Sequence, residues 1–365
     1  MEGMVTPSQH FWSGKRVLLT GHTGFKGTWC FLWLRRLGAD VHGLALEPDT
    51  QPSLYNLVGR PGAEGSIGDV RNSGFVKQVF DRVQPEIVIH MAAQALVHPS
   101  YEDPATTFDT NVMGLVRVLD AARSTPAVRA IVNVTSDKCY ENREQLWAYR
   151  ETEAMGGADP YSASKGCAEL VTASYRRSFF NKPDGGRLAS GRAGNVIGGG
   201  DWSGDRLVPD CIRAFQGEKP VMVRNPLSTR PWQHVMEPVC GYLLLAQALY
   251  ERGSEVAEGW NFGPVDDDAW PVSDVVDALV AAWGGKARWE HDKAFRPHEA
   301  MLLRVDAIKA RTRLGWRPRL RVGEALKWTV EWVRAVEAGQ SPLAVTLRQI
   351  ENFENIGIVK GLQPA

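Results

Sequence analysis

Between residues 16 and 196 the chain alternates short runs of apolar and β-branched residues with longer amphipathic stretches. Five runs have the length and composition of strands: Arg16–Thr20, Val41–Leu46, Ile87–Met91, Ala130–Val134 and Arg187–Arg192. Two intervening stretches, Thr106–Arg123 and Ala163–Arg177, carry apolar residues at helical spacing and are long enough for crossover helices. Repeated units of this kind predict an α/β fold with a Rossmann-like, doubly wound parallel sheet.

The residue pattern changes after Gly198, where clusters of Gly, Pro, Trp and Arg predict loops and short strands. We expect a dinucleotide-binding Rossmann domain over residues 11–198, completed by segments near 237–264 that return to the large sheet. A smaller C-terminal α/β substrate domain is expected over residues 199–236 and 265–355. Two interleaved domains of this kind predict a cleft between them.

Composition narrows the function classes. Of the 365 residues, 44% are hydrophobic, and Lys plus Arg balance Asp plus Glu at 42 each, so neither nucleic acid nor a membrane surface is expected as a partner. The five cysteines are scattered and form no CxxC pair, which favours free thiols in a reducing compartment and implies no metal site. No signal peptide or membrane-length apolar run is visible, so we expect a cytoplasmic protein.

A glycine-rich segment follows the first predicted strand and opens an amphipathic helix. It reads VLLTGHTGFKGTW and places Gly21, Gly24 and Gly27 where a backbone must turn tightly and approach a pyrophosphate at a helix N-terminus. An isolated glycine triplet is explained as well by a structural turn. The strand before it and the helix after it favour a dinucleotide site.

Two acidic residues could contact the adenosine half of a dinucleotide. Glu47 ends the second predicted strand at the offset where a carboxylate accepts from a ribose hydroxyl, and no Arg adjoins it in sequence, which favours NAD over NADP. A solvated strand end explains Glu47 equally well. Asp69, in IGDVRN, is the better candidate for the adenine edge, with Val70 against the ring; the alternative is an ordinary turn aspartate.

Tyr161 and Lys165 stand four apart at the head of a predicted helix, so they share one face about one turn apart. An ammonium beside a phenol favours the phenolate, which can take a proton from a sugar hydroxyl as hydride leaves the same carbon. YxxxK is common by chance. Its place downstream of a glycine-rich nucleotide loop raises its significance.

The string NVTSDKCY ends the fourth of the five predicted strands, and ligands of open parallel sheets sit at the C-terminal strand ends. Ser136, Asp137 and Lys138 are therefore expected to face a substrate. A solvated loop ion pair is the alternative for Asp137 and Lys138.

With these motifs, the chain resembles the extended short-chain dehydrogenase/reductases, and within them the branch of NAD-dependent 4,6-dehydratases that act on CDP-glucose. The resemblance runs from about Phe11 to Asn355 and rests on GHTGFKGTW, VTSDKCYEN, DPYSASKGCAELVTASYR, RAGNVIGGGDW, DRLVPDCIRA and RPWQHVMEP. Two segments depart from the sequence most common in the family, namely LWAYRETEAMGG and MLLRVDAIKA. These departures bear on the specificity for the sugar and the base.

The resemblance implies a catalytic set. Tyr161 and Lys165 act in oxidation at C4 of the glucose, and Ser136 holds the C4 oxygen. Most 4,6-dehydratases have Asp-Glu where this chain has Asp137 and Lys138, and the match makes Asp137 the general acid and Lys138 the base of the elimination. Asp137 would then act protonated and Lys138 neutral, which requires burial beside the ligand.

The resemblance also implies tightly held NAD, a nucleotide-sugar substrate and a homodimer or homotetramer formed through the helices containing Asn111 and Tyr161. The predicted cofactor-binding residues are Gly21, Thr23, Gly24, Phe25, Lys26, Gly27, Asp69, Val70, Ala92, Ala93, Gln94, Tyr161 and Lys165. The predicted substrate-binding residues are Asn195, Arg206 and Arg230, with a surface charge as the alternative for Arg206. The role of His22 stays open.

Two rival functions fit parts of this pattern. A sugar-nucleotide 4-epimerase on the same scaffold needs Tyr161 and Lys165 but no acid–base pair for elimination. A non-catalytic sensor of NAD or a sugar nucleotide has no use for the Ser136, Tyr161 and Lys165 set.

Overall fold

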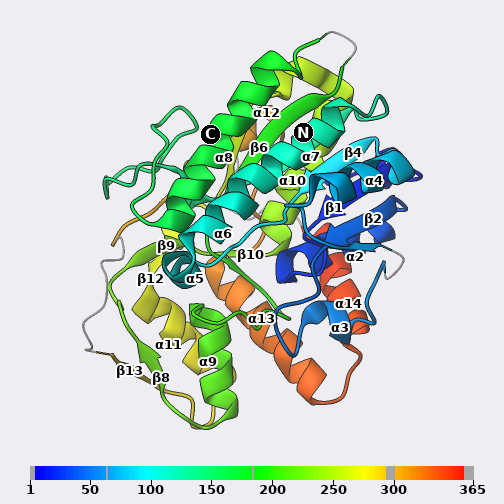
Figure 1. Cartoon of the computed structure of the whole chain (residues 1–365). Helices are drawn as coiled ribbons and strands as arrows, with labels where there is room; N and C mark the ends of the chain where they lie inside the picture. The colour runs from blue at the N-terminus through cyan, green and yellow to red at the C-terminus, as the bar shows by residue number, and fades with distance from the viewer. Residues whose placement is uncertain (1–4, 63–64, 183–184, 293–300, 357–365) are drawn as a thin grey trace.

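The protein is described here by a computed structural model that covers residues 5–62, 65–182, 185–292 and 301–356 (Figure 1). Its strands are β1 Arg16–Thr20, β2 Asp40–Ala45, β3 Ser66–Ile67, β4 Ile87–His90, β5 Ala130–Val134, β6 Arg187–Ala193, β7 Val196–Ile197, β8 Val221–Val223, β9 Thr229–Pro231, β10 Gln233–His234, β11 Gly259–Phe262, β12 Ala269–Pro271 and β13 Trp289–His291. Its α-helices are α1 Gln9–Trp12, α2 Phe25–Arg36, α3 Leu54–Leu57, α4 Ser73–Val83, α5 Val97–Glu102, α6 Pro104–Phe108, α7 Leu115–Arg123, α8 Pro160–Ser178, α9 Leu207–Gln216, α10 Met236–Arg252, α11 Val272–Trp283, α12 Ile308–Arg313, α13 Val322–Glu337 and α14 Pro342–Asn355.

The core is a seven-stranded sheet in the order β11-β6-β5-β4-β1-β2-β3, in which every neighbouring pair is parallel. The order reverses between β1 and β4, so the chain winds outward in both directions from the centre. This confirms the predicted doubly wound, Rossmann-like fold. The five predicted strands are β1, β2, β4, β5 and β6, each within one residue of the expected ends.

Helices cover both faces of the sheet because the strands are apolar on both sides. In β1, Val17 and Leu19 point into a core shared with α2 and α10, whereas Leu18 points into a second core shared with α4 and α7. Strands β4 and β5 are buried along their whole length. The two layers hold the C-terminal strand ends along one edge, where the site lies.

The expected helix Thr106–Arg123 is divided into three parts. Helix α6 is followed by a π-helix over Asp109–Gly114, and α7 begins only at Leu115. Wider turns of this kind are rare and often lie at functional sites. The spacing of apolar residues predicted one continuous helix, because a π-helical turn shifts the helical register without interrupting the apolar pattern.

Of the segments after residue 198, α9, α11 and α13 lie below the sheet and form the lower half of the molecule in Figure 1, whereas α10 and α12 lie in its upper half. Strand β11 pairs with β6, and α10 packs on β5 and β6, so these two elements join the large sheet as expected. The short pairs β9 with β12 and β8 with β13 belong to the lower half. The division into two domains stays a prediction, and part of its range, residues 293–300, lies outside the described residues.

Candidate active site at the C-terminal strand ends

Two glycines at the junction of β1 and α2, Gly21 in the loop and Gly27 in the first turn of the helix, are required by packing. Gly21 has φ +75°, and a Cβ on it would lie 2.8 Å from the backbone nitrogen of Ala92. A Cβ on Gly27 would lie 2.0 Å from the carbonyl oxygen of Gly21. These close approaches fix the turn that brings the start of α2 beside the end of β4.

Gly24 is different, because the protein leaves space at this position. It is the exposed N-cap residue of α2, no side chain caps the helix there, and a Cβ would come no nearer than 3.4 Å to the Gly21 carbonyl oxygen. Free amides at the start of a twelve-residue helix, next to an uncovered glycine, fit the pyrophosphate of NAD. Thr23 donates from Oγ1 to the carbonyl of Leu46 at 2.8 Å, which fixes the loop to the end of β2.

Both acidic candidates at the adenosine end have arginine partners. Asp69 accepts from the backbone nitrogen of Arg71 at 2.8 Å and from its guanidinium, whose hydrogen bond lowers the pKa of Asp69. Glu47 accepts from Nη2 of Arg60 at 2.6 Å, with both side chains exposed. The expectation that no arginine adjoins Glu47 holds in sequence but is wrong in space, since Arg60 folds back onto it from α3's C-terminal end.

The segment after β4 is held by a side chain that the sequence analysis did not assign to the site. Asn111, in the π-helix and 3% exposed, accepts from the backbone nitrogen of Gln94 at 2.8 Å and donates to its carbonyl at 3.0 Å. The same amide donates to Oγ of Ser164 at 2.8 Å, on α8. Asn111 therefore joins the predicted cofactor segment Ala92–Gln94 to the helix of Tyr161 and Lys165.

Ser136, Asp137 and Lys138 follow β5 in a short 3₁₀ turn. Oγ of Ser136 donates to Oδ1 of Asp137 at 3.0 Å and accepts from the backbone nitrogen of Lys138 at 3.2 Å. Asp137 is 2% exposed, and its Oδ2 has no hydrogen-bond partner within the described part of the chain. Burial raises the pKa of Asp137 against the opposing charges of Lys138 and Arg230, which is the direction that a general acid needs.

The absence of a side chain at residue 194 makes room for this carboxylate. A Cβ on Gly194, just beyond β6, would lie 2.4 Å from Oδ2 of Asp137. Asp137 is therefore enclosed from the side of β6 as well as from its own loop.

Tyr161 and Lys165 lie in the first turns of α8, which begins after the N-cap Asp159 with Pro160 in its first turn. The backbone nitrogen of Tyr161 donates to Oγ of Ser100 at 3.1 Å, and Lys165 Nζ is 6.0 Å from the centre of the tyrosine ring. Both side chains are buried, at 8% and 6% exposure. The two residues share one helix face, as predicted.

The protonation of this pair differs from the expectation. Burial raises the pKa of Tyr161 to about 12, although Ser136 and Arg206 act in the opposite direction. Burial lowers the pKa of Lys165 to about 8. Desolvation of the phenol thus outweighs the positive charges near it, so the protein's own residues favour the protonated phenol over the expected phenolate.

Charge interactions place the predicted arginines near these groups. Arg206, paired with Asp201 at 3.3 Å, acts on Tyr161, and Arg230 acts on Asp137. Arg230 also donates to the carbonyl of Thr229 at 3.0 Å. Asn195 contributes its backbone carbonyl to Gln233 at 3.0 Å. Of the predicted substrate residues, the two arginines lie close enough to the catalytic groups for their charges to lower the pKa of Tyr161 and of Asp137.

A tyrosine that the sequence analysis missed lies under the site. Nζ of Lys26 is 5.7 Å from the ring centre of Tyr242, on α10, and the buried hydroxyl of Tyr242 has no hydrogen-bond partner among the residues that the structure describes. The charge of Asp137 acts on both residues. Burial, with the charges of Arg206 and Lys165, lowers the pKa of Lys26 to about 7. Tyr242 stands within an apolar helix, where the sequence gives no signal for it.

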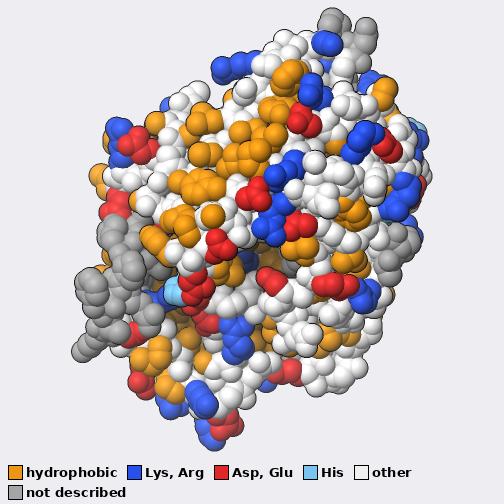
Figure 2. Space-filling model, in the orientation of Figure 1, with side chains coloured by type: hydrophobic (Ala, Val, Ile, Leu, Met, Phe, Trp, Pro, Cys, Tyr) orange, Lys and Arg blue, Asp and Glu red, His pale blue; other side chains and the backbone are white. Residues whose placement is uncertain are grey.

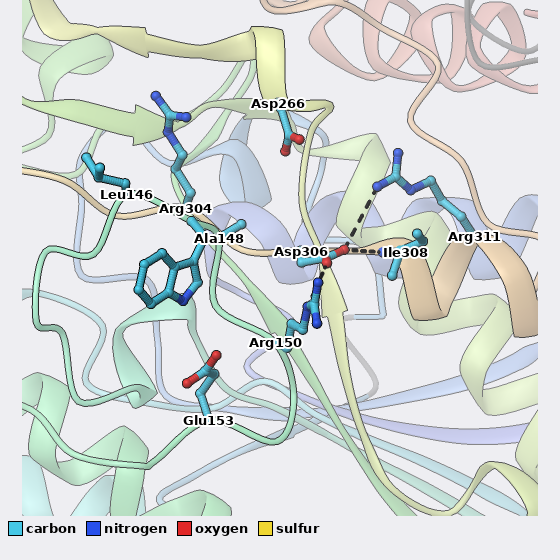
Figure 3. A pocket seen from close by; sticks show the side chains of 10 residues that line it. Leu146, Ala148, Arg150, Glu153, Asp266, Arg304, Asp306, Ile308 and Arg311 are labelled. Atoms are coloured by element: carbon cyan, nitrogen blue, oxygen red, sulfur yellow. Dashed lines mark hydrogen bonds and ion pairs between the residues drawn. The ribbon is translucent and has the colours of Figure 1, made fainter.

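The space-filling view shows a hollow near the centre of the face that carries α8 (Figure 2). A separate cavity of about 540 Å³ lies beside the loop after the 3₁₀ turn (Figure 3). Its lining is Leu146, Trp147, Ala148, Arg150, Glu153, Asp266, Arg304, Asp306, Ile308 and Arg311. Because none of these ten is a predicted site residue, this cavity is distinct from the catalytic groups.

Two further findings concern the whole chain. Among the helices that the structure describes, none has the length and apolar character needed to span a bilayer. All five cysteines are free thiols.

Comparisons with known proteins identify the family of this chain. Residues 18–329 match the GDP-mannose 4,6 dehydratase family. The chain is 51% identical over 350 residues to CDP-glucose 4,6-dehydratase from Salmonella typhimurium, covering 94% of this chain and 98% of the relative.

Solved structures match the fold. A Thermus thermophilus UDP-glucose 4-epimerase in complex with NAD is 25% identical with a TM-score of 0.73, covering 87% of this chain and 99% of that one. A UDP-glucose-4-epimerase from Stenotrophomonas maltophila with bound NAD and formylated UDP-arabinopyranose is 21% identical with a TM-score of 0.77, covering 89% and 100%. With the sequence matches, these findings show that the chain belongs to the GDP-mannose 4,6 dehydratase family of extended short-chain dehydrogenase/reductases.

Proposed function

We propose that the chain is an NAD-dependent CDP-glucose 4,6-dehydratase that converts CDP-D-glucose to CDP-4-keto-6-deoxy-D-glucose with loss of water. The observation that carries the proposal is the position of Asp137. This carboxyl is enclosed next to Ser136 and Lys138 and is close enough to Tyr161 for its charge to act on the phenol. The 51% identity to a relative that bears this name supports the choice of substrate.

The oxidation half uses the groups on α8. Tyr161 takes the proton of the 4-hydroxyl, Ser136 holds the C4 oxygen, and Lys165 adds a positive charge close to the phenol. NAD, held at the junction of β1 and α2, would supply the acceptor for the C4 hydride, the donor of hydride to C6 and a positive charge near the phenol.

The elimination half uses the pair after β5. The 4-keto group acidifies the C5 proton, which Lys138 removes in its neutral form, and Asp137 gives a proton to the departing C6 hydroxyl, which leaves as water. C5 regains a proton when hydride reaches C6. The raised pKa of Asp137 supports its part, because the carboxyl must carry a proton when it acts.

We also propose which residues bind the cofactor and the substrate. The backbone amides of Phe25 and Lys26, beside Gly24 at the start of α2, would bind the pyrophosphate, and Asp69 with Val70 would meet the adenine. The segment Ala92–Gln94 would pass beneath the dinucleotide. Asn195, Arg206 and Arg230 would bind the phosphates and sugar of the substrate.

We also propose a homodimer or homotetramer and a cytoplasmic location. Figure 2 shows apolar side chains gathered in a band across the face that carries α7 and α8. Met113 is 44% exposed in the π-helix and Leu170 is 62% exposed on α8, so this face supports pairing with a second copy. Five free thiols support a reducing compartment.

The test is product formation from a panel of CDP-, TDP-, GDP- and UDP-glucose, with NAD added. We expect a 4-keto product from CDP-glucose, and no 4-keto product from any of the four would contradict the proposal. The double variant Asp137→Asn with Lys138→Met is expected to lose the keto-deoxy product, whereas a 4-epimerase would keep its turnover.

A further inference from the structure

A buried ion pair lies directly behind the catalytic groups and takes no part in the proposed chemistry. Arg192, on β6, donates from Nη2 to Oε2 of Glu169, on α8, at 2.8 Å, and the two side chains are 6% and 4% exposed. Gly259, on the neighbouring β11, leaves the space for it, since a Cβ there would lie 2.3 Å from Nη2 of Arg192.

Glu169 holds the start of the catalytic segment. Its Oε1 accepts from Oγ1 of Thr135 at 2.6 Å, and Thr135 is the residue before Ser136. Its Oε2 also accepts from Oγ of Ser190 at 2.7 Å, on β6. The carboxylate therefore ties the end of β5 to α8 and β6 at once.

Arg192 holds the other end of that segment. Its Nη1 donates to the hydroxyl of Tyr140 at 2.8 Å, and this hydroxyl donates to Oδ1 of Asn261 at 2.6 Å, on β11. Tyr140 stands two residues after Lys138. Ser136, Asp137 and Lys138 thus lie between two anchors, at 135 and 140, that meet at one ion pair.

The carboxylate of Glu169 also acts on a residue proposed for the oxidation step. Glu169 lies one turn beyond Lys165 on α8, as Lys165 lies one turn beyond Tyr161. Its negative charge acts on Lys165 in the direction that keeps the ammonium protonated, against the effect of burial.

Stability alone does not account for this arrangement. Removing two charges from water costs several kcal/mol per ion, and apolar residues of similar volume often stabilise a core as well or better. What an ion pair provides here is direction, because each of its hydrogen bonds fixes one atom of a different element.

We infer that Glu169 and Arg192 are positioning residues that clamp both ends of the Ser136–Lys138 segment and align it with Tyr161 and Lys165; the inference rests on the proposed dehydratase function. It predicts that weakening the pair slows the elimination more than the oxidation, because the acid and base sit on the clamped loop whereas Tyr161 and Lys165 sit on a helix.

The experiment compares Glu169→Gln and Arg192→Lys with Glu237→Gln as the control. Glu237 is also a fully buried glutamate, but it accepts hydrogen bonds from backbone nitrogens of Arg319 and Leu320, and no described contact joins it to the catalytic segment. Gln at 169 is isosteric and loses the charge, and Lys at 192 keeps the charge but cannot bridge Glu169 and Tyr140 together.

For both test variants we expect kcat with CDP-glucose to fall about tenfold or more while KM changes less than about threefold. NADH absorbance should accumulate during turnover, which marks oxidation running ahead of elimination. Backbone amides of residues 136–140 should exchange with solvent about tenfold faster than in the wild type. The control should show none of these changes.

Equal kcat, no NADH accumulation and unchanged exchange in the test variants would overturn the inference. If both variants lost a cooperative thermal transition, the pair would be a folding requirement and the positioning role would likewise be overturned. A wild type that yields no keto product would contradict the proposed function instead, and the exchange of residues 136–140 would still decide whether the pair holds this segment.

Discussion

Gly24 and Gly27 lie three residues apart at the start of α2, yet the structure needs them for different reasons. A Cβ on Gly27 would collide with the Gly21 carbonyl, whereas a Cβ on Gly24 meets only ordinary contact. The spacing of the glycines in the sequence alone does not distinguish the roles of Gly24 and Gly27. The difference arises from how the loop packs, and it separates a folding role from a binding role.

We therefore predict opposite outcomes for two matched variants. Gly27→Ala should lower the free energy of unfolding by about 1–3 kcal/mol or more because backbone atoms must move apart. Gly24→Ala should leave the thermal midpoint nearly unchanged but weaken NAD about tenfold, because the methyl group enters the space beside the helix amides. Thermal melts and fluorescence titration with NAD measure both. Unaltered NAD affinity in a folded Gly24→Ala protein would argue against this cradle.

At the same scale, the sequence predicted which residues meet but not their protonation. The burial of Asp137 raises its pKa in the expected direction, whereas Tyr161 shifts upward rather than downward. A residue's motif does not encode its desolvation, which depends on every element packed around it. For the same reason Tyr242 and the Arg60 partner of Glu47 were not predicted.

Helices and strands were predicted well where the hydrophobic pattern was long and regular. The strands β1 and β5 begin and end at the expected residues, because continuous apolar runs can only be buried between two helical layers. The two-residue strand β3 and the π-helix were not foreseen. The first is too short to show a period, and the second depends on the side-chain contacts of Asn111 with Gln94 and Ser164.

Helix α8 gives a prediction of its own, since one face carries the catalytic pair and another carries exposed Leu170. If this face joins two copies, Leu170→Glu should convert the oligomer to a monomer, because a charge would be buried without a partner. Leu227→Glu is the control, as Leu227 is 74% exposed and belongs to the loop between β8 and β9, not to α8. Light scattering after size exclusion measures both masses, and an unchanged mass for Leu170→Glu would rule out this face.

At the scale of the whole molecule, Glu237 joins the sheet layer to the C-terminal part. From α10, its Oε1 accepts from the backbone nitrogens of Arg319 and Leu320, both at 2.8 Å, just before α13. Burial raises its pKa to about 7. The folded protein therefore keeps this carboxyl protonated at pH values where the unfolded chain has lost the proton.

The sign of the pH effect follows from this difference. The contribution of Glu237 to stability is fully present below pH 4.5, falls as the pH rises, and is lost above about 7. A shift of this size corresponds to about 3 kcal/mol. Glu237→Gln should flatten the dependence of the unfolding free energy on pH between 4.5 and 7, measured by urea denaturation. The same slope in the wild type and in the variant would show that Glu237 is not the titrating group.

The proposed dehydration requires that hydride leaves C4 and returns to C6 of the same hexose while water is lost between C5 and C6. The most direct measurement is the fate of deuterium in CDP-glucose labelled at C4, followed by NMR and mass spectrometry. We expect a 4-keto-6-deoxy product with the label at C6 and, in heavy water, a solvent deuterium at C5. A label that stays at C4 of an epimerised sugar, or a product without label at C6, would contradict it.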